Sequence, residues 1–381
     1  TQPNTLFPYT TLFRSSGQSP GGVRQIGPPM KSPGIFLTAL LVMAFDHAGA
    51  APPTVRVGPV RRVFHNGEHN AFTDLCRFHD ALYLTFRSCP DGHMVHPTAA
   101  TIILRSRDEG ATWEPVHRFS VKDRDTRDPH FLVFQDQLFV YTGTWWSGPT
   151  TLPREEYDLN KHLGYAVRSD DGAKWSDPVM LEGTFGHYIW RAATTGGKAY
   201  LCGRRKPGFE IGPKGEGDKV QSLMLESDDG LVWKKRAYFQ ETGGDETAFL
   251  FTDDGSLVAA ARHGGGGNAQ LLRSKPPYTE WVRKSFDRPL GGPLIAQWGG
   301  HLLIGGRKTT RDAGPKTSLC WLVEDSLQEF AELPSGGDNS YPGFVALSET
   351  RALVSYYSSH EKDASGKPIT AIYLTELSIV P

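Results

Sequence analysis

The sequence has 381 residues, a formal net charge of −1 and no run rich in lysine and arginine, so it lacks the basic surface that binds nucleic acids or anionic membranes. Its 42 glycines and 27 prolines lie between short apolar runs, which excludes a bundle of long helices and favours a turn-rich β architecture. With 38% hydrophobic residues, the chain is also too apolar to be disordered.

The first part of the chain, residues 1–50, is not expected to belong to the fold. Residues 1–29 have no apolar periodicity and contain a near-duplicated stretch that resembles translated adaptor sequence. Met30 and Lys31 then precede an apolar run at 34–45 and small residues at 48–50, which is the pattern of a secretory signal peptide. The run is shorter than the roughly 18 residues of a membrane-spanning helix. We predict a non-native leader (1–29), a signal peptide (30–50) and a secreted or periplasmic single domain (51–381).

The four cysteines do not follow the spacing of a disulfide framework, because they are scattered among predicted strands. Cys76 and Cys89 flank one predicted hairpin but are not opposite each other about its turn. We therefore expect free, buried thiols at Cys76, Cys89, Cys202 and Cys320.

A short motif, Asp-x-Gly-x-x-Trp, recurs at intervals of roughly 60 residues, which indicates an internal repeat. It predicts a β-hairpin in which the Asp caps the turn, the Gly takes a positive φ angle and the Trp packs on a neighbouring strand. The copies run from Asp108 to Trp113, from Asp170 to Trp175 and from Asp228 to Trp233, and a degenerate copy ends at Trp281.

A second repeated element is a pair of apolar strands joined by a tight turn. The copies lie at residues 72–86, 131–142, 192–203, 248–261, 294–305 and 344–356. A strand pair followed by an outer hairpin gives four strands per unit, which predicts an all-β fold, a six-bladed β-propeller of four-stranded antiparallel blades. The last unit has a third strand at 369–374 but little chain after it, so we expect residues 54–64 to supply its outer strand and close the ring.

In such a meander, the ends of the second strands and the starts of the first strands share one face, and the Asp turns lie on the other. We therefore treat the Asp turns as structural. Four of the six second strands end in arginine, and like charges held together need an anionic ligand or neighbouring carboxylates. A substrate that bears a carboxylate is the natural partner. These arginines are Arg87, Arg204 with Arg205, Arg262 and Arg307.

Two segments on this face resemble the sialidase superfamily. Residues 245–262 begin with Asp-Glu and end with Arg, and they are similar to the blade of that family in which a Glu opens the first strand and a triad arginine ends the second. Residues 339–347, Asn-Ser-Tyr-Pro-Gly-Phe-Val-Ala-Leu, look like the family's nucleophile segment. With the Asp turns, the resemblance covers residues 64–377.

The resemblance implies that Tyr341 is the nucleophile and that Glu246 accepts its proton. A tyrosine with an unperturbed pKa of about 10 needs such a base. Sialidases are an exception among glycosidases, because their nucleophile is a tyrosine and not a carboxylate. Arg262 and Arg307 would hold the substrate carboxylate. Asp91, in the loop after the second strand of the first blade, falls where the family keeps its general acid/base.

One position departs from the family pattern, because the first blade reads His69-Asn-Ala-Phe-Thr where a triad arginine is expected. Either Arg87, Arg127 or Arg191 replaces that arginine, or the carboxylate is held differently and the substrate is not sialic acid. Further candidate substrate ligands on this face are Asp128, His69 and His93.

The histidines of this face could bind a metal or carry protons. None of their spacings is a metal signature, so we predict no metal and no cofactor. They are His69, His93, His130, His187 and His263.

The favoured hypothesis is a retaining exo-glycosidase that acts on a terminal acidic sugar, and sialic acid is the favoured sugar. A uronate-specific hydrolase or polysaccharide lyase is the second hypothesis, in which His and Tyr transfer protons. A non-catalytic carbohydrate-binding propeller is the third, although Glu246 and Tyr341 occur in one blade each, unlike a site repeated in every blade. The expected partner is a carbohydrate, with no nucleic acid and no membrane, and we expect a monomer.

Overall fold

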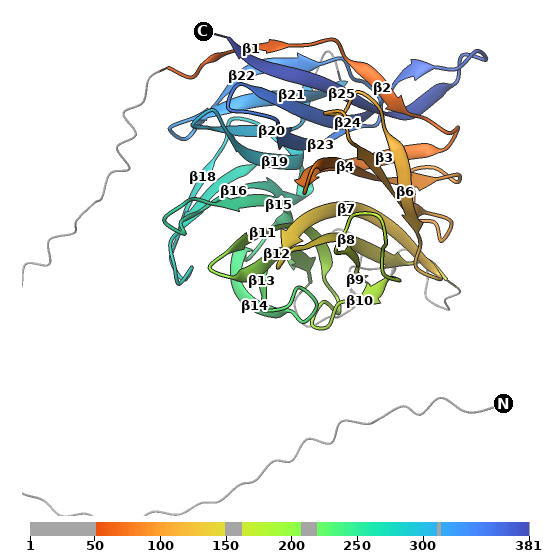
Figure 1. Ribbon diagram of the computed structural model, residues 1–381. Helices are drawn as coiled ribbons and strands as arrows, with labels where there is room; N and C mark the ends of the chain where they lie inside the picture. The colour runs from red at the N-terminus through yellow and green to blue at the C-terminus, as the bar shows by residue number, and fades with distance from the viewer. Residues whose placement is uncertain (1–50, 149–161, 207–218, 311–313, 381) are drawn as a thin grey trace, which may run out of the picture. The chain divides into compact units, whose positions relative to one another are not determined.

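The repeated strand pairs fold into six sheets, which the computed structural model describes over residues 51–148, 162–206, 219–310 and 314–380. They form an all-β, six-bladed propeller of antiparallel sheets, as predicted (Figure 1). The predicted leader and signal peptide lie outside the described residues. Within those ranges, no helix is long and apolar enough to cross a membrane.

Each of the first five blades is a meander of four consecutive strands. Blade I comprises β3 (His69–Phe78), β4 (Ala81–Cys89), β5 (Ala100–Ser106) and β6 (Glu114–Phe119). Blade II comprises β7 (Arg124–Phe134), β8 (Gln137–Trp146), β9 (His162–Ser169) and β10 (Val179–Met180). Blade III comprises β11 (Tyr188–Thr195), β12 (Lys198–Arg205), β13 (Gln221–Ser227) and β14 (Lys234–Gln240). Blade IV comprises β15 (Gly244–Phe251), β16 (Leu257–His263), β17 (Gln270–Ser274) and β18 (Trp281–Ser285), with a 3-10 turn at Gly264–Gly266. Blade V comprises β19 (Gly291–Trp298), β20 (His301–Thr310), β21 (Gly314–Val323) and β22 (Ser326–Leu333).

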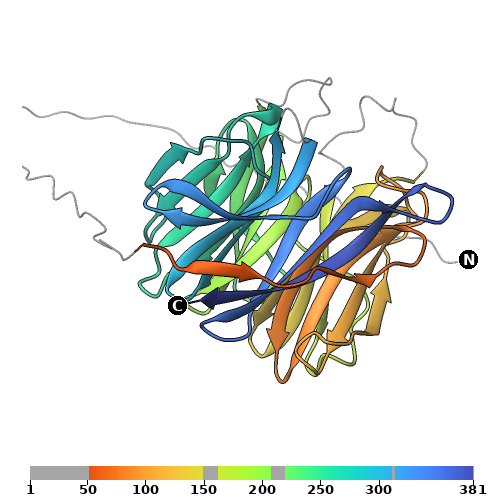
Figure 2. The same cartoon turned by 90° about the horizontal axis from the view of Figure 1, so that it is seen from above.

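Blade VI contains strands from both ends of the described chain. After β23 (Asn339–Ala346) and β24 (Arg351–Lys362), the long strand β25 (Pro368–Val380) pairs along its outer edge with β1 (Thr54–Val57) and β2 (Arg61–Phe64). Figure 2 shows the orange β1 running beside the blue β25. The predicted closure by residues 54–64 is confirmed, and it covers a sheet edge that would otherwise expose unpaired backbone groups.

Burial decreases from the inner to the outer strands of a blade. Every residue of β4 is buried, because neighbouring blades cover both of its faces, whereas β18 is mostly exposed. The four cysteines are free, as predicted, but only Cys89, Cys202 and Cys320 are buried, whereas Cys76 is half-buried. In the pairing of β3 with β4, Cys76 lies opposite Tyr83 and Cys89 opposite His69. The inner strands, which carry the candidate site residues, are therefore more buried than the outer ones.

The Asp turns join the third strand to the fourth in the first three blades, as predicted. In the first copy, Asp108 accepts a backbone N–H at 2.8 Å. In the other two copies the prediction named the wrong aspartate, because Asp171 and Asp229 accept the turn N–H groups, rather than Asp170 and Asp228. Those two turns have one residue fewer between the leading Ser and the Gly, so the capping position moves to the second Asp.

Candidate active site

The first strand of every blade carries a β-bulge at the same place, where two residues have no partner on the second strand. The bulges lie between Ala71/Asp74, Arg127/His130, Ile189/Ala192, Gly244/Thr247, Gly291/Leu294 and Ser340/Gly343. A bulge bends the strand and re-aims its side chains, which is why bulges are common beside active sites. The first bulged residues of the six blades are Phe72, Asp128, Trp190, Asp245, Gly292 and Tyr341.

Several bulged residues adopt a left-handed backbone conformation, which strains a residue with a side chain. The φ angles are 64° at Phe72, 51° at Asp128 and 51° at Tyr341. A hydrogen bond between two bulges helps to hold the strained backbone in place, since the Thr73 hydroxyl donates to the Tyr341 carbonyl at 2.9 Å. Strain at these positions marks them as candidate functional residues.

The predicted nucleophile and its base are in direct contact. The Tyr341 hydroxyl donates a hydrogen bond to Oε1 of Glu246 at 2.7 Å. The other carboxylate oxygen accepts hydrogen bonds from Arg262 at 3.0 Å and from the backbone of Gly292 at 3.1 Å. Arg262 also lies 3.4 Å from the tyrosine oxygen. Tyr341 of blade VI and the Glu246–Arg262 pair of blade IV thus form one group.

Electrostatics assign opposite protonation states to this pair. Burial alone would raise the pKa of Glu246, but Arg262, Arg204 and the Tyr341 hydrogen bond outweigh it and lower the pKa below its usual range. Burial, followed by the nearby Glu246 carboxylate, raises the pKa of Tyr341 well above its ordinary value. The tyrosine is therefore protonated in the free protein, and an anionic carboxylate is in place to take its proton.

Aromatic rings and one glycine fix the position of Tyr341. Its ring packs edge-on against Phe72 at 5.0 Å and against Trp190 at 6.2 Å between centroids. On another side lies Gly292, whose φ is 56° and where an added Cβ would come within 2.5 Å of the tyrosine ring. This position needs glycine both for its backbone conformation and for the close approach of the ring.

The arginines of this face are neutralised by neighbouring carboxylates, which is one of the two explanations left open by the sequence. Those with a carboxylate partner are Arg87, Arg127, Arg191, Arg204, Arg262 and Arg307.

Two of the candidate substrate-binding arginines serve the framework. Arg87 has no exposed side-chain surface and forms two hydrogen bonds with Asp125, at 2.8 and 2.9 Å, and it also donates to two loop carbonyls. Arg191 donates to Asp74 at 3.0 Å and to the carbonyls of Pro293 and Pro342. Since protein groups already occupy these donors, neither arginine is well placed to replace the missing triad arginine.

The other candidate arginines are Arg262, Arg307 and Arg127. The side chains of Arg262 and Arg307 are 33% and 24% exposed, and Arg307 lies 5.8 Å from the centre of the Tyr341 ring. Arg127 is more deeply buried, stacks on Phe72 and donates to the His93 carbonyl at 3.3 Å. Arg262 and Arg307 are therefore the arginines best placed to meet a ligand.

Asp91 is exposed, and its carboxylate accepts a hydrogen bond at 2.5 Å from the hydroxyl of Thr98 on the same loop. The contacts described above join Tyr341, Glu246 and Arg262 without Asp91. The geometry thus gives no support for the acid/base role that the family resemblance implies for this residue.

Asp128 has a different environment from Asp91, because it is buried on the β-bulge of blade II. The Tyr188 hydroxyl donates a hydrogen bond to its Oδ2, whereas Oδ1 is buried and has no hydrogen-bond partner. Burial raises the pKa of Asp128, Arg127 opposes this, and the charge of Glu246 adds to it, so that the pKa reaches about 6.

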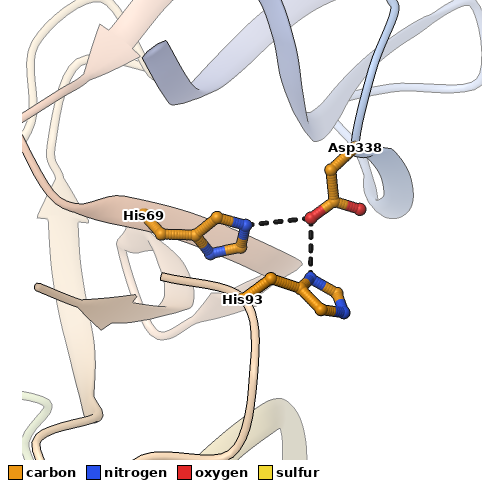
Figure 3. Close-up of side chains that lie close together, drawn as sticks. All are labelled: His69, His93 and Asp338. Atoms are coloured by element: carbon orange, nitrogen blue, oxygen red, sulfur yellow. Dashed lines mark hydrogen bonds and ion pairs between the residues drawn. The ribbon is translucent and has the colours of Figure 1, made fainter. Parts of the chain in front are cut away.

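His69, His93 and Asp338 form a cluster whose donor atoms lie within 4.8 Å of one another. Figure 3 shows both imidazoles directed at one carboxylate oxygen, at 2.9 and 2.7 Å. The other oxygen accepts a hydrogen bond from Tyr357 at 2.8 Å and lies 3.6 Å from Arg307. A metal-bound histidine normally donates its second ring N–H, but Nδ1 of His69 is buried without a partner. Hydrogen bonding explains this cluster better than a metal ion.

The other histidines of this face have local contacts. His130 lies 3.5 Å from Asp74, while the rings of His187 and His263 contact the carbonyls of Phe185 and Gly264. These three contacts connect none of them to the cluster of His69, His93 and Asp338.

Sequence reasoning missed Phe72, Gly292 and Asp338 as site residues. The first two follow from the bulges, since each lies at the same point of its first strand as Tyr341, and aligning the six strand starts on Tyr341 would have found them. Asp338 immediately precedes the segment that carries the tyrosine, so its position beside a candidate nucleophile was a usable signal.

Comparison with solved structures relates this architecture to known proteins. A protein of unknown function from Dyadobacter fermentans matches with a TM-score of 0.67 at 21% identity, over 86% of this chain and 100% of that chain. The sialidase of Trypanosoma rangeli in complex with the inhibitor DANA matches with a TM-score of 0.60 at 13% identity, over 81% of this chain and 55% of that chain. A Hadza microbial sialidase matches with a TM-score of 0.59 at 14% identity, over 81% and 65%.

The chain has the fold of the sialidases. It spans about half the length of the Trypanosoma rangeli sialidase. No protein-family model and no curated protein matches the sequence. At these identities the likeness concerns the sialidase fold alone, so any function has to be argued from the residues of this chain.

Proposed function

We propose that the protein is a retaining exo-glycosidase that removes a terminal acidic sugar from glycoconjugates, with sialic acid as the first candidate. The observation that carries this proposal is the 2.7 Å hydrogen bond from the Tyr341 hydroxyl to Glu246, two buried side chains. The sialidase fold supports the same conclusion. Export through residues 30–50, and a carbohydrate as the partner, belong to this proposal.

The proposed reaction has two displacement steps. In the first, Tyr341 attacks the anomeric carbon while Glu246 takes the phenolic proton, the bond to the leaving group breaks, and the leaving-group oxygen gains a proton from a general acid. In the second, water attacks the same carbon and gives a proton back to that group, the bond to Tyr341 breaks, and the proton on Glu246 returns to the tyrosine. Arg262 and Arg307 would hold the sugar carboxylate, because a guanidinium matches a carboxylate in charge and geometry.

Turnover of a fluorogenic sialoside by residues 51–381 tests the proposal. We expect Tyr341→Phe and Glu246→Gln each to lower kcat by at least about 10²-fold. Tyr356→Phe is the matched control, since it removes a buried tyrosine hydroxyl that bonds the Pro334 carbonyl, and it should keep its activity. With a fluorinated sialoside, mass spectrometry should find the sugar attached to the peptide that contains Tyr341. Full activity in both site variants would refute the nucleophile assignment.

A uronate-specific hydrolase is the second candidate, and the engagement of Arg87 and Arg191 in the framework favours it. With two partly exposed arginines beside the tyrosine, the site suits a smaller carboxylate-bearing sugar as well. A panel of sialosides, uronides and neutral glycosides separates the two candidates. Turnover of uronides alone would replace sialic acid as the substrate and leave the roles of Tyr341 and Glu246 unchanged.

A further inference from the structure

Asp128 has a hydrogen-bond partner for only one of its two carboxyl oxygens. It occupies the same position on the bulge of blade II as Tyr341 does on the bulge of blade VI, and both residues have a φ of 51°. Tyr188 donates to Oδ2, but Oδ1 is buried and without a hydrogen-bond partner. An ionised carboxylate with an unpaired buried oxygen is costly, so this geometry suits a neutral acid or an oxygen that meets a ligand.

Protonation of Asp128 suits one of these oxygens and leaves the other with a proton to donate. The carbonyl oxygen then accepts the hydrogen bond from Tyr188, and the hydroxyl oxygen, Oδ1, carries a proton for which the described residues provide no acceptor. Glycoside cleavage requires such a donor, because an alkoxide leaving group has to gain a proton as its bond to the sugar breaks.

We propose that Asp128 is the general acid/base of the reaction, an inference that rests on the function proposed above. In the first step, its Oδ1 proton moves to the leaving-group oxygen as the carbon–oxygen bond breaks and the bond to Tyr341 forms. In the second step, the ionised Asp128 takes a proton from the water that attacks the sugar. After one cycle both Asp128 and Tyr341 are protonated again.

The charges around Asp128 agree with this role. The groups that face it are Arg127 and Asp125 from its own strand, Tyr188 from β11 and Glu246 from β15, and Tyr341 from β23. Burial and the carboxylate of Glu246 favour the neutral acid and outweigh Arg127. Below pH about 6, two neighbouring carboxyl groups are thus in opposite states, Glu246 ionised beside the nucleophile and Asp128 protonated, which is how an acid and a base are assigned at one pH.

Leaving-group dependence tests this assignment. The substrates are two glycosides of the sugar that the wild-type chain hydrolyses, one with an alkyl alcohol and one with a strongly acidic phenol, which leaves without protonation. For Asp128→Asn we expect kcat/KM to fall about 10²–10⁴-fold with the alkyl glycoside and less than about tenfold with the phenyl glycoside. Asp136→Asn is the matched control, because Asp136 lies in the β7–β8 turn of the same blade and also has a positive φ.

A second variant guards against misfolding of Asp128→Asn. The hydrogen bond from Tyr188 lowers the pKa of Asp128, so Tyr188→Phe should move the alkaline limb of the kcat/KM profile to higher pH for the alkyl glycoside and leave the phenyl glycoside profile unmoved. Equal losses with both substrates, an unmoved limb, or a selective loss in Asp91→Asn instead would overturn the assignment. A wild-type chain that cleaves neither glycoside would refute the proposed function itself.

Discussion

Arg87 and Arg262 each lie near the end of the second strand of a blade, β4 in blade I and β16 in blade IV. Their surroundings nevertheless give them different roles. Arg87 has no exposed side-chain surface and is bonded on all sides to Asp125 and loop carbonyls. Arg262 is one-third exposed, and its guanidinium reaches both Glu246 and the Tyr341 oxygen. An arginine at a strand end thus belongs to the framework or is a candidate ligand according to its exposure and its contact with the tyrosine, and we expect the two classes to respond differently to substitution.

The largest expected effect is on the framework side. Arg87→Met leaves Asp125 buried without its partner, and breaking a buried ion pair costs about 3–5 kcal/mol. The free energy of unfolding, measured by urea denaturation, should fall by that amount. The double variant with Asp125→Asn should recover part of the loss. Arg62→Met, in an exposed pair with Glu361, should change little, and a similarly small change in Arg87→Met would show that the two classes do not differ.

Acidification should weaken the framework around Arg191 next. Burial, followed by the charge of Arg191, lowers the pKa of the adjacent His130 to about 4, so the folded protein keeps this histidine neutral where the unfolded chain binds a proton. Its contribution to stability is complete above pH 6.5 and is lost as the pH falls from 6.5 towards 4. The loss is about 3 kcal/mol, since each pKa unit is worth about 1.4 kcal/mol.

His187 contributes in the same pH range, because burial also lowers its pKa to about 4, so replacing His130 should remove only part of the loss. Thermal unfolding between pH 7 and pH 4 should therefore show a smaller loss of stability in His130→Asn than in the wild type. An identical pH dependence in the two proteins would contradict a neutral, buried His130.

The smallest of these effects on stability is expected for Arg262, the candidate ligand-binding arginine. Arg262→Lys keeps the positive charge beside Glu246 but loses the planar guanidinium, so kcat/KM with the acidic glycoside should fall about 10²-fold. The free energy of unfolding should change by less than about 1 kcal/mol, because the side chain is partly exposed. A fall in stability as large as that of Arg87→Met would place Arg262 in the framework instead.

Much of the fold could be predicted from the sequence, because turns and apolar strands are local signals. The Asp turns, the six strand pairs and the closure by residues 54–64 each followed from a few neighbouring residues. Tyr341, Glu246 and Arg262 were named from two segments, and the structure brings them together. The capping aspartate in two turns was misassigned, since one residue of spacing decides which side chain reaches the turn.

The partners of the arginines could not be predicted, because each pair joins residues distant in the sequence. Nothing near Arg87 in the sequence indicates that Asp125 on the next blade will neutralise it, and nothing near Arg191 points to Asp74. The bulges were missed for a related reason, since a bulge is a property of the register between two strands. The buried state of Asp128 depends on Tyr188 and Glu246, which come from two other blades.

The pairing of β1 and β2 with β25 also has a consequence for how the chain folds. The first strand of the propeller to be synthesised pairs with the last, so the edge of blade VI stays open until the whole ring has been made. Closing so long a loop is slow compared with forming local hairpins. The ring is therefore expected to close late, in one cooperative step, and loss of either end of the propeller should leave an open, aggregation-prone edge rather than a smaller stable protein.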